Sequence, residues 1–266
     1  MPRGRSRAIA AGPVASGTVY LVGAGPGAPD LLTVRAARLL ARADVVFHDA
    51  LVHPDTLVLA ARAKIIDVGK RSGKHSAAQR FINKRLVDAA RRHAVVVRLK
   101  GGDPMLFGRA QEEIAALEAA GVHCEIVPGV TSALAAAADL RTSLTVRGSV
   151  RTFTFVTPRA ADAAAAHSWV AALRHADAGA IYMGLREAPA IAQALIETGS
   201  ARTTPVAIVA DASLPTARLR HTTLADLAAD AEWADGAPAL VLIGPQFRER
   251  TSRPREARPA EAARCA

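Results

Sequence analysis

The stretch VVVRLKGGDPMLFGR, from Val95 to Arg109, joins a β-branched apolar run to two adjacent glycines, an aspartate and a proline. The valine run predicts a buried strand, and Gly101-Gly102 allow a backbone turn that a Cβ would hinder. Residues 110–120 then predict a helix. A strand that ends in a Gly-Gly-Asp turn before a helix lies where open α/β sheets bind ligands, beyond the carboxyl ends of their strands.

Strand and helix patterns alternate on both sides of this stretch. Before residue 146 we expect strands at 19–22, 44–47, 64–68, 95–99 and 123–127, and helices at 31–41, 77–92, 111–120 and 131–139. After it we expect strands at 152–157, 180–183, 206–209, 218–222 and 239–243, and helices at 168–175, 188–198 and 224–231. The first half indicates a mostly parallel sheet with helices on both faces, and the second a mixed sheet with a hairpin.

The predicted fold class is therefore α/β with two lobes, residues 18–146 and 147–247, and a site in the cleft between them. Residues 1–17 and 248–266 are expected to be a disordered basic leader and a disordered tail. The net charge of +10 suits nucleic acid or a polyanionic small substrate. Only 4% of the residues are aromatic, so bases would find few stacking partners, and we expect no nucleic-acid partner.

The cysteine content and the apolar runs exclude other classes. Cys124 and Cys265 form no disulfide framework, which is typical of a cytoplasmic protein in a reducing compartment. No His/Cys cluster has the spacing of metal ligands, so we expect no metal. No apolar run reaches the roughly 18–20 residues that a membrane span requires, so we expect no membrane partner.

The segment GAGPGA, residues 23–28, formally fits the dinucleotide pattern G-x-G-x-x-A. Asp49, at the end of the second expected strand, would then be the acidic residue of such a site. However, Pro26 and Pro29 remove two backbone N–H groups that a pyrophosphate would use. A strand-to-helix turn that needs glycine is favoured, and the dinucleotide alternative predicts affinity for NAD.

Several polar residues follow expected strands, and each has more than one interpretation. Asp49 could be a base, a ribose ligand or a cap, and Lys70 could hold an anion, donate a proton or lie on a solvated turn. Asp103 could accept hydrogen bonds from a ribose or an ammonium group, or form an Asx-turn. Thr131 or Ser132 could cap the following helix or bind a ligand.

Eight motifs in this order make the assignment more specific: GAGPGAPDLLT, VVFHDALV, VGKRSGKHS, VVVRLKGGDPMLFGRAQEE, VPGVTSALAAAA, SLTVRG, FTFVT and IYMGL. Together they closely resemble the tetrapyrrole (corrin/porphyrin) methyltransferases, with the uroporphyrinogen-III C-methyltransferases as the most similar branch. The resemblance covers about residues 18–244. The GGDP segment with the downstream FGR and PGVTS carries the specificity, whereas GAGPG alone does not.

The resemblance implies S-adenosyl-L-methionine bound in a folded form between the lobes, with S-adenosyl-L-homocysteine as product. By position, its contacts would be Pro26, Gly101, Gly102, Asp103, Leu106, Thr131, Ser132, Met183 and Ala212. Asp49 and Lys70 would be the acid/base pair, with Glu112 or Asp49 stabilising or deprotonating the methylated ring. Arg109 and Arg147 would bind the substrate.

The implied reaction is C-methylation of uroporphyrinogen III at two adjacent pyrrole rings to give precorrin-2, toward cobalamin, sirohaem or haem d1, by a homodimer. The chain departs from the branch at Ser143, Val146, Pro158 and Arg159, and at residues 210–213. The alternatives are a methylase of a later corrin precursor, or a paralogue that binds the cofactor or the tetrapyrrole without turnover. A third alternative, a methylase of ribosomal RNA, would suit the positive charge.

Overall fold

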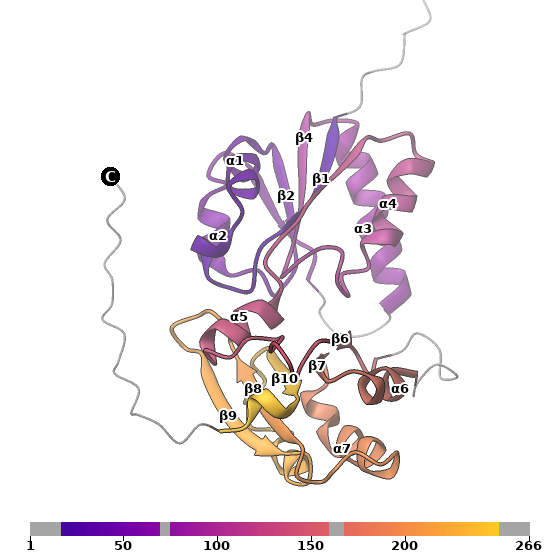
Figure 1. Ribbon diagram of the computed structural model, residues 1–266. Helices are drawn as coiled ribbons and strands as arrows, with labels where there is room; N and C mark the ends of the chain where they lie inside the picture. Colours follow the sequence, from indigo (N-terminus) through magenta and orange to yellow (C-terminus); the bar gives the residue numbers. More distant parts are fainter. Residues whose placement is uncertain (1–16, 70–74, 160–167, 250–266) are drawn as a thin grey trace, which may run out of the picture.

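The computed structural model describes residues 17–69, 75–159 and 168–249. Lys70 and most of the expected leader and tail lie outside these residues. The described chain forms two α/β lobes, each built on one five-stranded sheet, which confirms the expected fold class (Figure 1). In this part of the chain no helix is long and apolar enough to cross a membrane.

The sheet of the first lobe is entirely parallel and has the strand order β3-β2-β4-β1-β5. Its strands are β1 (Thr18–Gly23), β2 (Val45–His48), β3 (Lys64–Asp67), β4 (Val95–Lys100) and β5 (Cys124–Val127). Helices α1 (Val34–Arg42) and α2 (Pro54–Val58) cover one face, and α3 (His75–Ala90) and α4 (Ala110–Ala119) cover the other (Figure 1). All five strands therefore end at one edge of the sheet.

Strand β4 is the central strand of this sheet and is buried on both faces. Val96 packs with residues of α3 and α4, whereas Val97 and Leu99 pack with residues of α1. Because side chains alternate along a strand, Arg98 and Lys100 share the α3/α4 face with Val96. Both are almost completely buried, so two charged side chains lie inside the first lobe.

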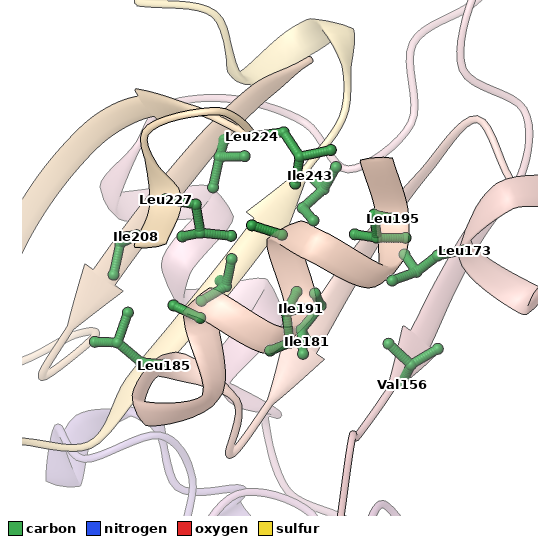
Figure 2. Packing of buried hydrophobic residues seen from close by; sticks show 14 of the residues in the cluster. Val156, Leu173, Ile181, Leu185, Ile191, Leu195, Ile208, Leu224, Leu227 and Ile243 are labelled. Carbon is green, nitrogen blue, oxygen red and sulfur yellow. The ribbon is translucent and has the colours of Figure 1, made fainter. Parts of the chain in front are cut away.

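The second lobe has a mixed sheet with the strand order β6-β7-β10-β8-β9. Its strands are β6 (Phe153–Val156), β7 (Ala178–Tyr182), β8 (Pro205–Ala210), β9 (Arg218–Thr223) and β10 (Ala239–Ile243). Strands β6 and β7 are parallel, and β8 and β9 form the expected antiparallel hairpin. Helices α6 (Ser168–His175) and α7 (Ala188–Glu197) cover one face with aliphatic side chains such as Leu173, Ile191 and Leu195 (Figure 2).

Helix α5 (Ser132–Asp139) covers the other face of the second sheet. Its buried Ala133, Ala135 and Ala136 pack with Ala180 and Ala207 of the sheet, and these small side chains allow a close approach. In the described residues the chain thus passes from the first lobe to the second at residues 128–131. Helix α5 precedes residue 146, and the expected boundary at that position stays a prediction.

One local prediction is wrong, and one short helix was not predicted. The helix expected at 224–231 is wrong: turns lead into a 3-10 helix, Leu227–Asp230. The reason is that the N–H groups of Leu224 and Ala225 bond to the carbonyls of Thr204 and Arg202, which holds this segment to the neighbouring loop. Helix α2 was not expected, because five residues give too little periodicity to detect.

Candidate active site

Three glycine-containing loops meet at the carboxyl edge of the first sheet, at residues 23–28, 101–103 and 128–131. Gly25 N–H donates to Gly102 O at 3.2 Å, and Gly102 N–H donates to Gly25 O at 2.7 Å. A Cβ on Gly129 would overlap Gly102 O and lie 2.8 Å from the Cα of Gly23. The loops can approach this closely only because glycine occupies positions 23 and 129.

The same contacts count against a dinucleotide site at residues 23–28. The N–H group of Gly25 is used by the Gly102 carbonyl rather than pointing toward a ligand. A 3-10 turn, Pro29–Leu31, follows the glycines, and α1 begins only at Val34. A helix N-terminus therefore does not directly follow the glycine turn, as a pyrophosphate site of this type requires.

Asp103 joins two of the three loops. Its Oδ1 accepts a hydrogen bond from Met105 N–H at 2.8 Å, which forms the expected Asx-turn, and its Oδ2 accepts one from Gly129 N–H at 2.9 Å. An ionised carboxylate offers about four acceptor positions. Besides these two hydrogen bonds, Asp103 can therefore accept hydrogen bonds from a ligand.

Asp103→Ala should weaken the binding of S-adenosyl-L-homocysteine, because it removes both hydrogen bonds from the loop junction. Hydrogen bonds to charged groups contribute about 1.5–3 kcal/mol, so we expect an increase in Kd of about tenfold or more. Isothermal titration calorimetry measures this directly. Equal affinity in the variant and the wild type would contradict the assignment of residues 101–103 to the cofactor.

The second lobe contributes the β8–β9 loop to the same junction. Ser213 Oγ accepts a hydrogen bond from Ala28 N–H at 3.0 Å, and Ser213 N–H donates to Asp139 Oδ2 at 2.8 Å. The predicted cofactor residues Pro26 and Ala212 thus lie on segments that are hydrogen-bonded to each other. Ser213 was not predicted from the sequence, although it directly follows Ala212.

Tyr182, at the end of β7, provides a second contact between the lobes. Its hydroxyl lies 2.7 Å from Thr131 Oγ1 and accepts a hydrogen bond from Ala133 N–H at 3.3 Å. Thr131 occupies the N-cap position of α5 but makes no side-chain cap bond. The ring centroid of Phe107 lies 5.1 Å from that of Tyr182. Sequence reasoning missed Tyr182, whose only signal was its place in the IYMGL motif.

The remaining predicted cofactor residues lie on these same segments. Met183 follows Tyr182 with a left-handed backbone (φ 57°) and a side chain that is 43% exposed. Left-handed conformations of residues other than glycine are uncommon and often occur at functional sites. Leu106 N–H bonds to Asp103 O at 3.3 Å, and Ser132 begins α5. The structure therefore brings all nine predicted cofactor residues onto neighbouring segments at the junction of the two lobes.

A hollow of about 650 Å³ borders this junction on the exposed side of α5. Its lining includes Leu134 and Arg141 with Phe153 and Phe155 from β6. The ring centroid of Phe155 lies 6.1 Å from that of Tyr182. The hollow is therefore next to the aromatic residues that join the lobes.

Arg109 and Glu112 form a bidentate ion pair at the start of α4. Arg109 Nε and Nη2 each donate to one carboxylate oxygen of Glu112 at 2.7 Å. These hydrogen bonds raise the pKa of Arg109, and such charge-assisted pairs are among the stronger hydrogen bonds in proteins. The predicted substrate ligand and the predicted catalytic carboxylate are thus direct partners.

The other predicted residues lie apart from this pair. Asp49 follows β2 at the same sheet edge, and its Oδ1 accepts a hydrogen bond from Arg98 Nη2 at 2.5 Å. Arg147 is exposed in a tight turn that Val146 and Val150 close with two backbone hydrogen bonds. Lys70, the expected partner of Asp49, lies outside the described residues.

Comparison with known proteins identifies the family of this chain. The sequence profile of the tetrapyrrole (corrin/porphyrin) methylases matches residues 18–228. The chain belongs to the tetrapyrrole methylase family. Among curated relatives, siroheme synthase of Azotobacter vinelandii is 45% identical over 242 residues, which is 90% of this chain and 52% of the relative. Siroheme synthase of Chromobacterium violaceum is 45% identical over 240 residues, which is 90% of this chain and 51% of the relative. The chain spans about half the length of these relatives.

Solved structures of tetrapyrrole methylases share the two-lobed fold. Uroporphyrin III C-methyl transferase from Thermus thermophilus superposes with a TM-score of 0.74 at 38% identity, over 86% of this chain and 98% of that one. The same enzyme has been solved in complex with S-adenyl homocysteine, with a TM-score of 0.72. Cobalt precorrin-4 methyltransferase superposes with a TM-score of 0.75 at 30% identity, over 87% of this chain and 96% of that one.

Proposed function

We propose that this protein uses S-adenosyl-L-methionine to methylate uroporphyrinogen III at two adjacent pyrrole rings, giving precorrin-2 for sirohaem or cobalamin synthesis. The observation that carries the proposal is the convergence of the three glycine loops with Ser213 and Tyr182. These segments hold all nine residues that the family resemblance assigns to the cofactor. A solved relative of 38% identity is complexed with S-adenyl homocysteine.

The residues at the junction fit such a cofactor. A Cβ on Gly23 or Gly129 would occupy the space between the loops, so the backbone itself forms the surface that a ligand would meet. Asp103 and Thr131 supply oxygen atoms for hydroxyl or ammonium donors, while Leu106 and Met183 supply apolar surface. When bound, S-adenosyl-L-methionine supplies an electrophilic methyl group attached to a sulfonium.

The basic residues suit a substrate that carries eight carboxylates. Arginine binds carboxylates through two parallel hydrogen bonds, and Arg109 already shows this geometry with Glu112. Arg147 projects from an exposed turn of the second lobe. The chemistry then requires mainly that the substrate carbon be held about 3–3.5 Å from the methyl group, in line with the bond that breaks.

Methylation leaves a cationic ring that must lose a proton, and a carboxylate is needed to accept it. Both oxygens of Glu112 accept hydrogen bonds from Arg109. Arg98 holds Oδ1 of Asp49. We therefore assign the proton to Oδ2 of Asp49 and the stabilisation of positive charge to Glu112, with Lys70 as the acid partner of Asp49.

Arg147→Ala should impair use of the substrate and leave the cofactor site intact. A hydrogen bond between charged groups contributes about 1.5–3 kcal/mol, so we expect the KM for uroporphyrinogen III to rise about tenfold to 100-fold. Steady-state kinetics under anaerobic conditions gives the KM, and calorimetry gives the Kd for S-adenosyl-L-homocysteine. A loss of cofactor affinity together with the rise in KM would show that the turn acts on both sites.

The test of the reaction is an anaerobic incubation of the purified protein with uroporphyrinogen III and S-adenosyl-L-methionine, analysed by mass spectrometry. A gain of two methyl groups is expected. Cofactor binding without methylation would instead favour the second candidate, a methylase of a later corrin precursor. Two observations favour that candidate: the fold similarity to cobalt precorrin-4 methyltransferase and the altered segment at residues 141–147.

The protein is a cytoplasmic homodimer in this proposal. Support comes from the family resemblance and from the cysteine content. The monomer mass is 27.7 kDa, so light scattering after size-exclusion chromatography should give about twice this mass. A monomer mass at micromolar concentration would overturn the dimer.

A further inference from the structure

A buried cluster of charged side chains lies under the site, between β4 and the helices α3 and α4. Glu113, on α4, is completely buried and accepts hydrogen bonds from Arg98 Nε at 3.0 Å and Lys100 Nζ at 3.1 Å. Gln79, on α3, also donates to Glu113 at 3.1 Å. With Asp49 included, the cluster holds two cations and two carboxylates, and its formal charges cancel.

Arg98 is the member of this cluster that contacts the site. Its Nη1 donates to the carbonyl oxygens of Leu99 at 3.1 Å and Phe47 at 3.4 Å, and its Nη2 donates to Asp49 Oδ1 at 2.5 Å. With the Nε bond to Glu113, the guanidinium is fixed by acceptors on β2, β4 and α4. Only 3% of the Arg98 side chain is exposed, compared with 31% for Asp49. The orientation of Asp49 is thus set from inside the lobe.

Stability alone does not explain this arrangement. Burying charged groups costs several kcal/mol of desolvation per ion, and apolar residues of similar volume are often as stable or more so. Burial lowers the pKa of Lys100, and Arg98 adds to this effect. Burial opposes the charge of Arg98 too, but the carboxylates of Asp49 and Glu113 outweigh it and raise the pKa of Arg98. A cation that stays charged in the interior is suited to hold a carboxylate.

We infer that Arg98 is a positioning residue for the methylation reaction, which holds Oδ1 of Asp49 so that Oδ2 faces the methylated ring. The inference rests on the proposed role of Asp49 as proton acceptor. Arg98 itself touches neither substrate nor cofactor, and its effect on the reaction is carried entirely by Asp49. Glu113 orients the guanidinium from the opposite side.

A double-mutant cycle tests this inference. In the wild-type background, Arg98→Met should lower kcat by about 100-fold, the size of effect that a small misplacement of a reacting group produces. The KM for uroporphyrinogen III and the Kd for S-adenosyl-L-homocysteine should change less than about threefold, since Arg98 contacts neither ligand. In the Asp49→Asn background, the same substitution should change kcat by less than about threefold. Equal factors in both backgrounds, or a loss confined to KM or Kd, would overturn the inference.

Two further variants separate positioning from folding. Arg98→Lys keeps a cation near Asp49 and Glu113 and should recover about tenfold of the lost kcat; if Arg98→Met does not fold, the cycle is run with this variant. Lys100→Met removes a cation from the same cluster without touching Asp49, so stability should fall while kcat stays within about threefold. A matching loss of kcat in Lys100→Met would mean that any damage to the cluster has the same effect, which contradicts a specific role for Arg98.

The failure of the inference is distinguishable from failure of the proposed function. If wild-type protein adds two methyl groups but Asp49→Asn retains full kcat, the role of Asp49 is wrong, and the inference falls with it while the reaction stands. If Asp49→Asn loses activity and Arg98→Met lowers kcat by the same factor in both backgrounds, only the role of Arg98 is wrong. If the wild-type protein transfers no methyl group, the proposed function fails first.

Discussion

Glu113→Met is expected to lower the free energy of unfolding by about 3–5 kcal/mol, the cost of leaving buried charges without their partner. In the wild type, Glu113 is fully buried and its two oxygens face Arg98 and Lys100. Without it, two buried cations would lie together with the partly exposed Asp49 as the remaining carboxylate partner. A fall of this size is a large fraction of the stability of a typical domain.

Urea unfolding followed by circular dichroism measures this change. The neighbouring Glu112→Met is a matched control, because Glu112 is half exposed and its pair with Arg109 lies near the solvent. Exposed ion pairs contribute about 0–1 kcal/mol, so the control should unfold close to the wild type. If the two variants lost equal stability, the buried Arg98 and Lys100 would not depend on Glu113 as their internal partner.

Gly129→Ala is expected to abolish most of the cofactor affinity. The added Cβ would overlap Gly102 O and meet the Cα of Gly23 at 2.8 Å, and both are backbone atoms. The loops after β1, β4 and β5 would have to separate, which also stretches the bond from Gly129 N–H to Asp103. Overpacking of this kind costs about 1–3 kcal/mol; if the loss appears in binding, the Kd for S-adenosyl-L-homocysteine rises up to about 100-fold.

Gly121→Ala provides the control for this experiment. Gly121 has a positive φ of 67° and lies in the α4–β5 turn, where a methyl group added to its Cα would have nothing within 4 Å. A left-handed backbone costs a residue other than glycine about 1–2 kcal/mol, so this variant should lose stability and keep its cofactor affinity. Calorimetry on both variants measures the Kd for S-adenosyl-L-homocysteine. An unchanged Kd in Gly129→Ala would contradict the proposal that the three glycine-containing loops form the cofactor site.

Much of the fold follows from local sequence patterns. The valine-rich runs predicted both ends of β1, β2 and β4 to within one residue, because strands buried on both faces need continuous apolar sequence. Local sequence pattern also predicted a helix at residues 224–231, and this prediction is wrong. There, hydrogen bonds to residues 202 and 204 outweigh the weak helix preference.

The parts of the site that lie within a sequence motif could be predicted. Contacts between residues that are far apart in the sequence could not. Gly101, Gly102 and Asp103 lie in the GGDP motif, and the structure places them at the loop junction. Arg98 and Asp49 are 49 positions apart, and their contact depends on the pairing of β2 with β4. A usable signal was present, since two charged residues, Arg98 and Lys100, alternate with apolar ones in a strand predicted to be buried.

The passage of the described chain between lobes at residues 128–131 has a consequence for how relatives of this protein can diverge. Helix α5 belongs to the core of the second sheet, so a genetic exchange at about residue 128 would transfer a complete second lobe with its own interior. An exchange at residue 146 would divide that interior between two parents. Recombination at the earlier point offers a route to a new substrate specificity in which the GGDP loop of the first parent is kept.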